Sequence, residues 1–355
     1  MTVARSGGAT AADAEKLLAL INANWTTQVI GVAAELRIAD LLAGGARGAG
    51  EIAAATACDP ASMHRLLRAL CSLDLCAERA GGAFALTPMG AMLGTGARPG
   101  VRSWAIYTAL CQWDIWRHLL DSVRSGDCAR RLLTGGEGYD HLANDAQAAS
   151  IFNAAMVELT QIIAAAVARA CDFATAGRVV DVGGGHGELL AAVLAAHPHL
   201  QGVLYDLPHA MDGARQQMAR AGLACEFVAG SFFESVPRAD VHLLKSILHN
   251  WNDDRCVELL RQCRRATLPG GRLLIVERIM PERITGAPGE RAIVRADLNM
   301  MVSLGGRERT AAEFDALLAA AGYAPRRVTA LELGYSLIEA QPVGQGGGRA
   351  ESPTH

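Results

Sequence analysis

The chain has 355 residues, of which 51% are hydrophobic and 5% aromatic, and its formal net charge is −3. This length exceeds the usual size of one domain, so it predicts two domains with a substantial core. The weak negative charge disfavours a nucleic-acid partner, because phosphate binding requires a concentrated basic surface. The nine cysteines contain no CxxC pair, which favours reduced thiols over a disulfide framework or a zinc site.

The N-terminal residues 1–16 lack the apolar segment of a secretory signal. The longest apolar stretches, such as residues 162–168, are far shorter than a membrane span. We therefore expect a soluble, cytoplasmic protein with no membrane partner.

The first part of the chain has the pattern of a helical domain. Residues 11–43 repeat leucine, isoleucine and valine at helical spacing, which predicts one or two amphipathic helices. Asp59 and Pro60 suit the N-cap and first turn of a helix that ends near Cys71. Two short strands are expected on either side of Gly81 and Gly82. This order of helix, helix and hairpin is a winged-helix pattern.

A winged helix suggests DNA recognition, but the expected recognition helix offers only His64, Arg65 and Arg68 in an apolar run. Because so little charge is present to neutralise phosphates, we favour a packing or dimerisation module.

The remainder of the chain predicts an α/β domain. Residues 101–172 have a helical pattern, and strand and helix patterns then alternate, which indicates a parallel sheet covered on both faces. Two late segments, PRRVTAL and YSLIEA, fit an antiparallel pair at the edge. The expected domains are residues 1–100, dimerisation; 101–342, catalytic, with 101–172 as a helical linker that contributes to the substrate pocket; and 343–355, a flexible tail.

A glycine-rich turn follows the first strand of this domain, in the sequence VVDVGGGHG of residues 179–187. Gly183 and Gly185 leave room for a ligand near the main chain, and Asp206 ends the next strand, where a carboxylate can accept ribose hydroxyls. The spacing is GxGxG, and Glu188 stands where a dinucleotide would place its pyrophosphate. The cationic sulfonium of S-adenosylmethionine suits this site far better.

At this point the sequence resembles the metal-independent S-adenosylmethionine-dependent O-methyltransferases of the caffeate and hydroxyindole type, which have many bacterial natural-product members. The resemblance implies a Rossmann-like class I methyltransferase sheet preceded by a mostly helical winged-helix dimerisation domain. It also implies a domain-swapped homodimer and a substrate pocket closed by helices. The motifs that carry it are DVGGGHG, YDLPHA, GSFF, LLKSILHNW, LLIVERIMP and GGRERTAAEF.

The family pattern assigns cofactor roles to particular residues. It implies Gly183, with Gly185 in the same turn, at the methionine end, Asp206 at the ribose, Ser231 and Phe232 beside the adenine, and Lys245 near the methionine moiety. The family usually has aspartate where Ser231 and Asn250 stand here. Because Ser231 is uncharged, its contact with the adenine is expected to be weaker. S-adenosylhomocysteine is the expected product of the cofactor, and no metal is expected.

His249 is the candidate general base, because a phenol ionises near pH 10 and must lose its proton as the methyl group arrives. With an ordinary pKa of about 6.5, this imidazole is expected to be largely neutral at pH 7. The resemblance implies that Glu277 and Glu308 flank it, where a carboxylate fixes the tautomer of the ring. The alternative for each glutamate is an exposed charge at a loop or strand end.

The expected acceptor is a hydroxyl of an aromatic or conjugated small molecule, as in secondary metabolism. Asn299 and Ser303 are four residues apart and share a helix face, so they can hydrogen-bond a flat substrate. Core packing is an equal alternative for each apolar candidate. The candidate substrate-binding residues are Phe152, Met156, Asn250, Asn299, Met300 and Ser303.

Two alternatives remain open. The same fold supports methyl transfer to nitrogen or carbon, or a non-methylating reaction that uses the sulfonium charge. A cofactor-sensing DNA-binding protein is the other, and the sparse basic residues disfavour it.

Overall fold

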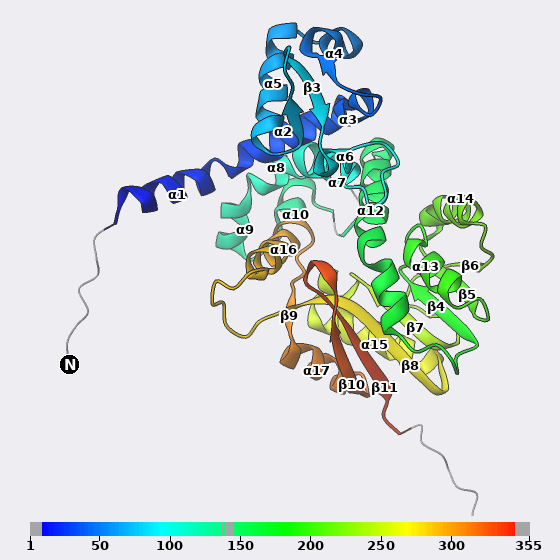
Figure 1. Cartoon of the computed structure of the whole chain (residues 1–355). Helices are drawn as coiled ribbons and strands as arrows, with labels where there is room; N and C mark the ends of the chain where they lie inside the picture. Colours follow the sequence, from blue (N-terminus) through cyan, green and yellow to red (C-terminus); the bar gives the residue numbers. More distant parts are fainter. Residues whose placement is uncertain (1–8, 137, 140–141, 143–144, 345–355) are drawn as a thin grey trace, which may run out of the picture. The chain divides into compact units, whose positions relative to one another are not determined.

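The computed structural model describes residues 9–136, 138–139, 142 and 145–344, and the chain divides into two compact units, Met1–Trp113 and Asp114–His355 (Figure 1).

The first unit is mostly helical, with one small sheet. The predicted helix start at Asp59 is confirmed, because its side chain accepts a hydrogen bond from the Ser62 N–H and Pro60 is the first helical residue. The strands pair antiparallel in the order β1-β3-β2. The elements are α1 Ala11–Ile21, α2 Ala23–Glu35, α3 Ile38–Leu42, β1 Arg47–Gly48, α4 Ala49–Thr56, α5 Pro60–Ser72, β2 Cys76–Glu78, β3 Ala83–Leu86, α6 Pro88–Ala91, α7 Arg102–Ile106 and the π-helical turn η1 Tyr107–Cys111.

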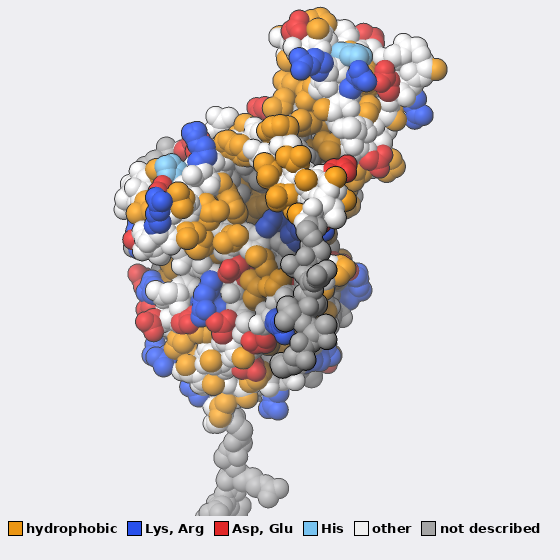
Figure 2. All heavy atoms as spheres, turned by 90° about the vertical axis from the view of Figure 1, so that its left-hand side faces the viewer, with side chains coloured by type: hydrophobic (Ala, Val, Ile, Leu, Met, Phe, Trp, Pro, Cys, Tyr) orange, Lys and Arg blue, Asp and Glu red, His pale blue; other side chains and the backbone are white. Residues whose placement is uncertain are grey.

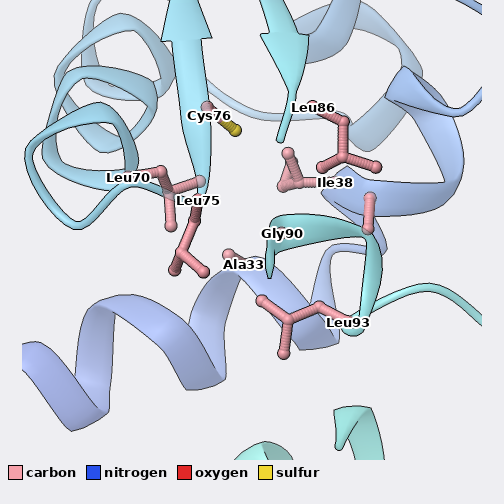
Figure 3. Close-up of a pocket in the computed structure, with 9 residues that line it drawn as sticks. Ala33, Ile38, Leu70, Leu75, Cys76, Leu86, Gly90 and Leu93 are labelled. Carbon is pink, nitrogen blue, oxygen red and sulfur yellow. The ribbon is translucent and has the colours of Figure 1, made fainter. Parts of the chain in front are cut away.

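A small apolar space lies inside this unit. Figure 3 shows Ala33, Ile38, Leu70 and Leu75 among the side chains around it. No ionisable side chain other than the buried thiol of Cys76 lines it, so this space is a gap in a hydrophobic core and not a place for acid–base chemistry.

The first two helices expose their apolar side chains. Helix α1 buries no residue, and Leu17 and Ile21, one turn apart, are 57% and 61% exposed. Hydrophobic side chains also reach the surface widely on the face shown in Figure 2. Exposed apolar surface of this extent marks an interaction site.

Two helical stretches are longer and more apolar than the sequence patterns indicated. By length and composition alone, Ala11–Glu35 and Ala146–Ala170 could each cross a membrane, so the expectation that all apolar stretches are too short was wrong. It was based on unbroken apolar runs and ignored the alanine-rich segments between them. Ile163 and Val167 of the second helix belong to a protein core, which accounts for its apolar character.

The second unit is an α/β domain. Its helices are α8 Trp113–Trp116, within which the boundary falls, α9 Leu119–Ser125, α10 Ala129–Thr134, α12 Ala146–Ala170, α13 Glu188–Ala196, α14 Met211–Ala221, α15 Asp253–Ala266, α16 Glu290–Ser303 and α17 Ala311–Ala320, with short 3₁₀ turns η2 Pro208–Ala210, η3 Leu248–Asn250 and η4 Glu332–Gly334. Its strands are β4 Arg178–Val182, β5 Gln201–Asp206, β6 Glu226–Ala229, β7 Ala239–Lys245, β8 Thr267–Met280, β9 Arg309–Thr310, β10 Tyr323–Ala330 and β11 Tyr335–Pro342.

These strands form one sheet in the order β10-β11-β8-β7-β4-β5-β6, with β9 added beside β8. Strands β4 to β8 are parallel, and β10 and β11 form the antiparallel edge pair that the sequence predicts.

Both faces of the sheet are covered by helices, as the alternating pattern predicts. Along β8, Leu274 and Val276 pack with residues of α12, α13 and α14, whereas Leu273 and Ile275 pack with residues of α15 and α17. The carboxyl ends of the parallel strands meet at one edge, which is where open α/β sheets bind ligands.

Candidate active site

The glycine-rich turn joins β4 to α13 at this edge. Gly183, Gly185 and Gly187 all have positive φ, of 71°, 56° and 81°. A Cβ atom on Gly183 would lie 2.5 Å from Cδ1 of Ile247, so the turn passes closely beneath the end of the neighbouring strand β7. Glycine is therefore required at position 183 by both conformation and space.

Asp206, at the end of β5, is fixed beside this turn. Its Oδ2 accepts a hydrogen bond of 2.7 Å from the Gly185 N–H, and its Oδ1 accepts one of 2.6 Å from the Leu207 N–H. Burial raises the pKa of Asp206, although these two hydrogen bonds oppose the rise.

A second carboxyl group lies beneath the turn. Asp181 in β4 is fully buried, and burial together with the nearby charge of Asp206 raises its pKa to about 7, against the opposing effect of Lys245. A site lined by acidic groups and an open glycine turn repels a pyrophosphate and fits a ligand with a sulfonium charge. The residues present therefore fit S-adenosylmethionine.

Phe232 lies on the other side of Gly183. Its Cε1 is 3.7 Å from the position of a Cβ on Gly183, and its ring contacts Trp251 edge-on. Ser231 makes a local contact, since its Oγ accepts a 3.4 Å hydrogen bond from the Phe233 N–H. The fold thus brings Gly183, Gly185 and Phe232 together with Asp206 close by, while the adenine contact expected for Ser231 remains a prediction.

His249 lies in η3, just after β7, and its ring faces two glutamates. Its Nδ1 is 3.1 Å from Oε1 of Glu308 and 3.6 Å from Oε2 of Glu277. The side chain of His249 is 11% exposed, and those of Glu277 and Glu308 are 0% and 1% exposed. The alternative that either glutamate is an exposed charge is therefore wrong.

The two carboxylates are themselves held in place. Oε1 of Glu277, at the end of β8, accepts a 2.9 Å hydrogen bond from the Leu248 N–H. The main-chain N–H of Glu308, just before β9, donates to Oδ1 of Asp297 at 2.9 Å. Within the described part of the chain, Nε2 of His249 has no hydrogen-bond partner. A histidine oriented in this way can accept a proton at Nε2 while Nδ1 remains bound to a carboxylate.

The charge state of His249 differs from the sequence-based expectation. Burial lowers the pKa of the imidazole, but the charges of Glu277 and Glu308 and the hydrogen bond to Glu308 outweigh it and raise the pKa to about 9. The ring is therefore mostly protonated at pH 7, and the expectation of a largely neutral imidazole was wrong. Burial, with the charge of Glu308, also raises the pKa of Glu277, although His249 opposes this.

One ligand atom from each of His249, Glu277 and Glu308 lies within 4.8 Å of the others, a separation that one metal ion can bridge. The hydrogen bond from His249 to Glu308 gives these groups a role without a metal. The absence of a metal requirement remains a prediction.

Five of the six candidate substrate residues lie on two helices, α12 and α16. In α16, Oδ1 of Asn299 accepts a 3.0 Å hydrogen bond from Nε1 of Trp116 and a 3.4 Å hydrogen bond from Oγ of Ser303. The neighbouring Met300 is half-buried. Phe152 and Met156 are one turn apart in α12, and the ring of Phe152 lies 5.4 Å from that of Tyr139. Among the described residues, the NH₂ group of Asn299 has no hydrogen-bond partner.

Asn250 is used by the protein itself. Its Nδ2 donates a 3.1 Å hydrogen bond to the carbonyl of Ser246, a residue with a left-handed φ of 55°. This bond closes the turn between β7 and η3, so the amide supports the main chain that carries His249. A substrate contact of Asn250 remains a prediction.

The sequence patterns did not identify two residues that contact this turn. Tyr335 donates or accepts a 3.2 Å hydrogen bond with Oγ of Ser246, and Arg309 is completely buried against the turn. The only indication of Arg309 in the sequence was its position next to Glu308.

Comparison with known proteins identifies both units. Residues 116–324 match the model of the O-methyltransferase domain, and residues 18–96 match that of the O-methyltransferase dimerisation domain. The chain belongs to the O-methyltransferase family. Phenazine O-methyltransferase PhzM of Lysobacter antibioticus is 39% identical over 332 residues, which cover 92% of this chain and 96% of that protein.

Two further relatives show the range of the family. The crystal structure of human N-acetylserotonin methyltransferase in complex with S-adenosylmethionine has a TM-score of 0.86 and 26% identity, and the match covers 95% of this chain and 99% of that chain. The 8-amino-8-demethylriboflavin N,N-dimethyltransferase of Streptomyces davaonensis is 36% identical over 305 residues, covering 83% of this chain and 86% of that protein.

These findings confirm the predicted fold class, in which a dimerisation domain precedes a class I methyltransferase domain. The chain is an S-adenosylmethionine-dependent O-methyltransferase of the secondary-metabolism type. Its dimerisation domain supports a homodimer, in agreement with the exposed apolar side chains of α1.

Proposed function

We propose that the chain methylates a hydroxyl group of an aromatic or conjugated small molecule and that His249 is the general base of the reaction. The observation that carries this proposal is the orientation of His249. Its Nδ1 is bound to Glu308 at 3.1 Å, and its Nε2 has no hydrogen-bond partner among the residues that the structure describes. Such a ring presents its second nitrogen to an acceptor hydroxyl.

The two glutamates have separate tasks in this proposal. Glu308 holds the ring through Nδ1, and Glu277 adds a second negative charge at 3.6 Å that stabilises the imidazolium formed by proton transfer. The base is active only when its imidazole is neutral, so protonation of His249 in the free enzyme lowers kcat/KM at low pH.

The donor site lies at the same sheet edge. When bound, S-adenosylmethionine would supply an electrophilic methyl group, with the neutral thioether S-adenosylhomocysteine as the leaving group. Asp206 accepts hydrogen bonds from the ribose hydroxyls, and Phe232 and Ser231 lie beside the adenine. Gly183, Gly185 and Lys245 hold the methionine end. General-base assistance contributes about 10²- to 10⁴-fold, and alignment of the acceptor oxygen with the methyl group contributes much of the rest.

The acceptor is a flat molecule. Asn299 and Ser303 of α16 supply its polar contacts, while Met300, Phe152 and Met156 provide apolar surface. Asn250 borders the same site, because it directly follows the base. We further propose that the homodimer is domain-swapped, that the catalytic domain spans residues 101–342 after a winged-helix domain of residues 1–100, and that the enzyme works in the cytoplasm without nucleic acid or membrane.

A substitution of the base tests the proposal. We expect His249→Ala to lower kcat by about 10²- to 10⁴-fold while the affinity for S-adenosylhomocysteine, measured by calorimetry, stays the same. His118→Ala is the matched control, because His118 also pairs with a carboxylate through Nδ1, at 2.9 Å from Asp121, but is a surface residue. Unchanged turnover in His249→Ala would remove His249 from the mechanism.

Methyl transfer to nitrogen is the second candidate, and the N,N-dimethyltransferase relative favours it. A neutral amine nitrogen is nucleophilic without first losing a proton, so an amine acceptor depends less on a base at His249 than a phenol does. Trials with labelled donor and matched phenol and aniline acceptors distinguish the two, because the mass and fragmentation of the product locate the methyl group. The same product analysis would detect C-methylation or a reaction that transfers no methyl group.

A further inference from the structure

Residues 306–309 contact the histidine turn, residues 248–251, along their whole length. A Cβ atom on Gly306 would lie 2.0 Å from the carbonyl oxygen of His249, so the two segments touch at that point. The Arg307 N–H donates a 2.9 Å hydrogen bond to the same carbonyl. The carboxylate of Glu308 then meets Nδ1 of His249.

Arg309 completes this contact from inside the protein. Its side chain is completely buried, its Nη1 donates to the Leu248 carbonyl at 2.9 Å, and its Nη2 donates to the Trp251 carbonyl at 2.7 Å. Nε and Nη2 also reach Oδ1 of Asp253, at 3.0 and 2.8 Å. The carbonyls of Leu248 and Trp251 lie on either side of His249 in the sequence. The carboxylate of Asp253 balances the buried positive charge of Arg309.

A buried guanidinium is costly unless its donors are paired. Within the described residues, every acceptor of Arg309 lies in the segment from Leu248 to Asp253, so its charge is compensated only while the turn keeps this shape. The planar, rigid fork of arginine allows little change in the separation of the two carbonyls. Because Glu308 is the preceding residue, one short segment holds both the turn and the carboxylate that faces the histidine.

We propose that Arg309 is a positioning residue, which sets the distance between His249 and Glu308 and therefore the strength of His249 as a base. This inference rests on the proposed role of His249. It adds a residue that contacts neither the substrate nor the ring, and acts through the main chain on both sides of the ring.

The test compares two arginines of the same segment. Arg307→Lys and Arg307→Met are the controls, because the Arg307 side chain binds Asp253 and Glu313 at the surface and is 44% exposed. For Arg309→Lys and Arg309→Met we expect kcat to fall about 10²-fold, as for a displacement of about 1 Å in a catalytic group. The rise of kcat/KM with pH should also move to lower pH, because the pKa of His249 falls when Glu308 no longer faces Nδ1.

The pH midpoint does not depend on how much of the enzyme is active. A lower kcat with an unmoved midpoint would therefore show a merely structural role and overturn the inference. If neither Arg309 variant folds, Asp253→Ala provides the same readout, because it removes the half-exposed carboxylate that holds Nε and Nη2 of Arg309 and leaves the buried guanidinium without its charge partner, so that its contacts to the two carbonyls loosen. An unmoved midpoint in that variant would also overturn it, whereas full activity of His249→Ala would overturn the proposed function instead.

Discussion

The side chain of His249 shows how burial and charge compete at one residue. Burial alone favours the neutral ring, but two buried carboxylates at 3.1 and 3.6 Å favour the imidazolium and raise the pKa to about 9. The neutral ring needed for proton abstraction is therefore the minor form at pH 7, and it becomes the major form as the pH rises through the folded-state pKa.

We expect kcat/KM to increase with pH up to about pH 9, measured with an acceptor whose own ionisation is known. Glu308→Gln should move this increase to lower pH, because the amide cannot stabilise the imidazolium by charge, and should lower kcat at the same time. A profile that is flat from neutral to alkaline pH would show that His249 is not the titrating base.

The cluster of His249, Glu277 and Glu308 also allows a test of metal dependence. We expect prolonged dialysis against a strong chelator to leave kcat unchanged, because the hydrogen bond and charges of the two glutamates already define the task of the histidine. Metal analysis of the dialysed protein provides the control. Loss of activity that a divalent ion restores would show a metal requirement.

The turn between β4 and α13 is an element whose conformation decides whether the donor binds. We expect Gly183→Ala to weaken S-adenosylhomocysteine binding at least tenfold, because its Cβ would lie 2.5 Å from Ile247 and its φ is 71°. Gly222→Ala, after α14, is the control, since its φ is 67° and its Cβ would meet open space. That variant should cost about 1 kcal/mol of unfolding free energy through backbone strain alone. Calorimetry measures the affinity of each variant for S-adenosylhomocysteine, and thermal unfolding measures its stability. Equal affinities of the two variants for S-adenosylhomocysteine would contradict this account.

Sequence patterns predicted those elements whose determinants are local. The N-cap at Asp59 illustrates this, since it depends only on the Ser62 N–H three residues further on. The alternating strands, the glycine turn and the antiparallel edge pair also followed from short patterns. The pKa of His249, the hydrogen bond of Asn250 to Ser246 and the burial of Arg309 did not, because they depend on distances between segments far apart in the sequence.

The exposed apolar face of α1 bears on how the whole molecule assembles. We expect the double substitution Leu17→Asp and Ile21→Asp to convert the dimer into monomers, because both side chains are more than half exposed and lie one helical turn apart in the first helix. Arg65→Asp, at an exposed position of α5, is the control for added negative charge. Light scattering gives the mass of each variant, and a dimeric double variant would place the interface elsewhere.

Glu308 is separated in the chain from His249 and Glu277, the other two members of the catalytic cluster, by an exposed connection. Residues 282–289 are all solvent-exposed and lie between β8, which ends just after Glu277, and the helix that precedes Glu308. A protease that cleaves after Arg283 would leave the parallel strands β4 to β8, the glycine turn and Asp206 on one fragment, and Glu308, Arg309 and strands β9 to β11 on the other. An enzyme nicked by trypsin at this position therefore keeps Glu308 beside His249 only while the two fragments stay together through the pairing of β11 with β8.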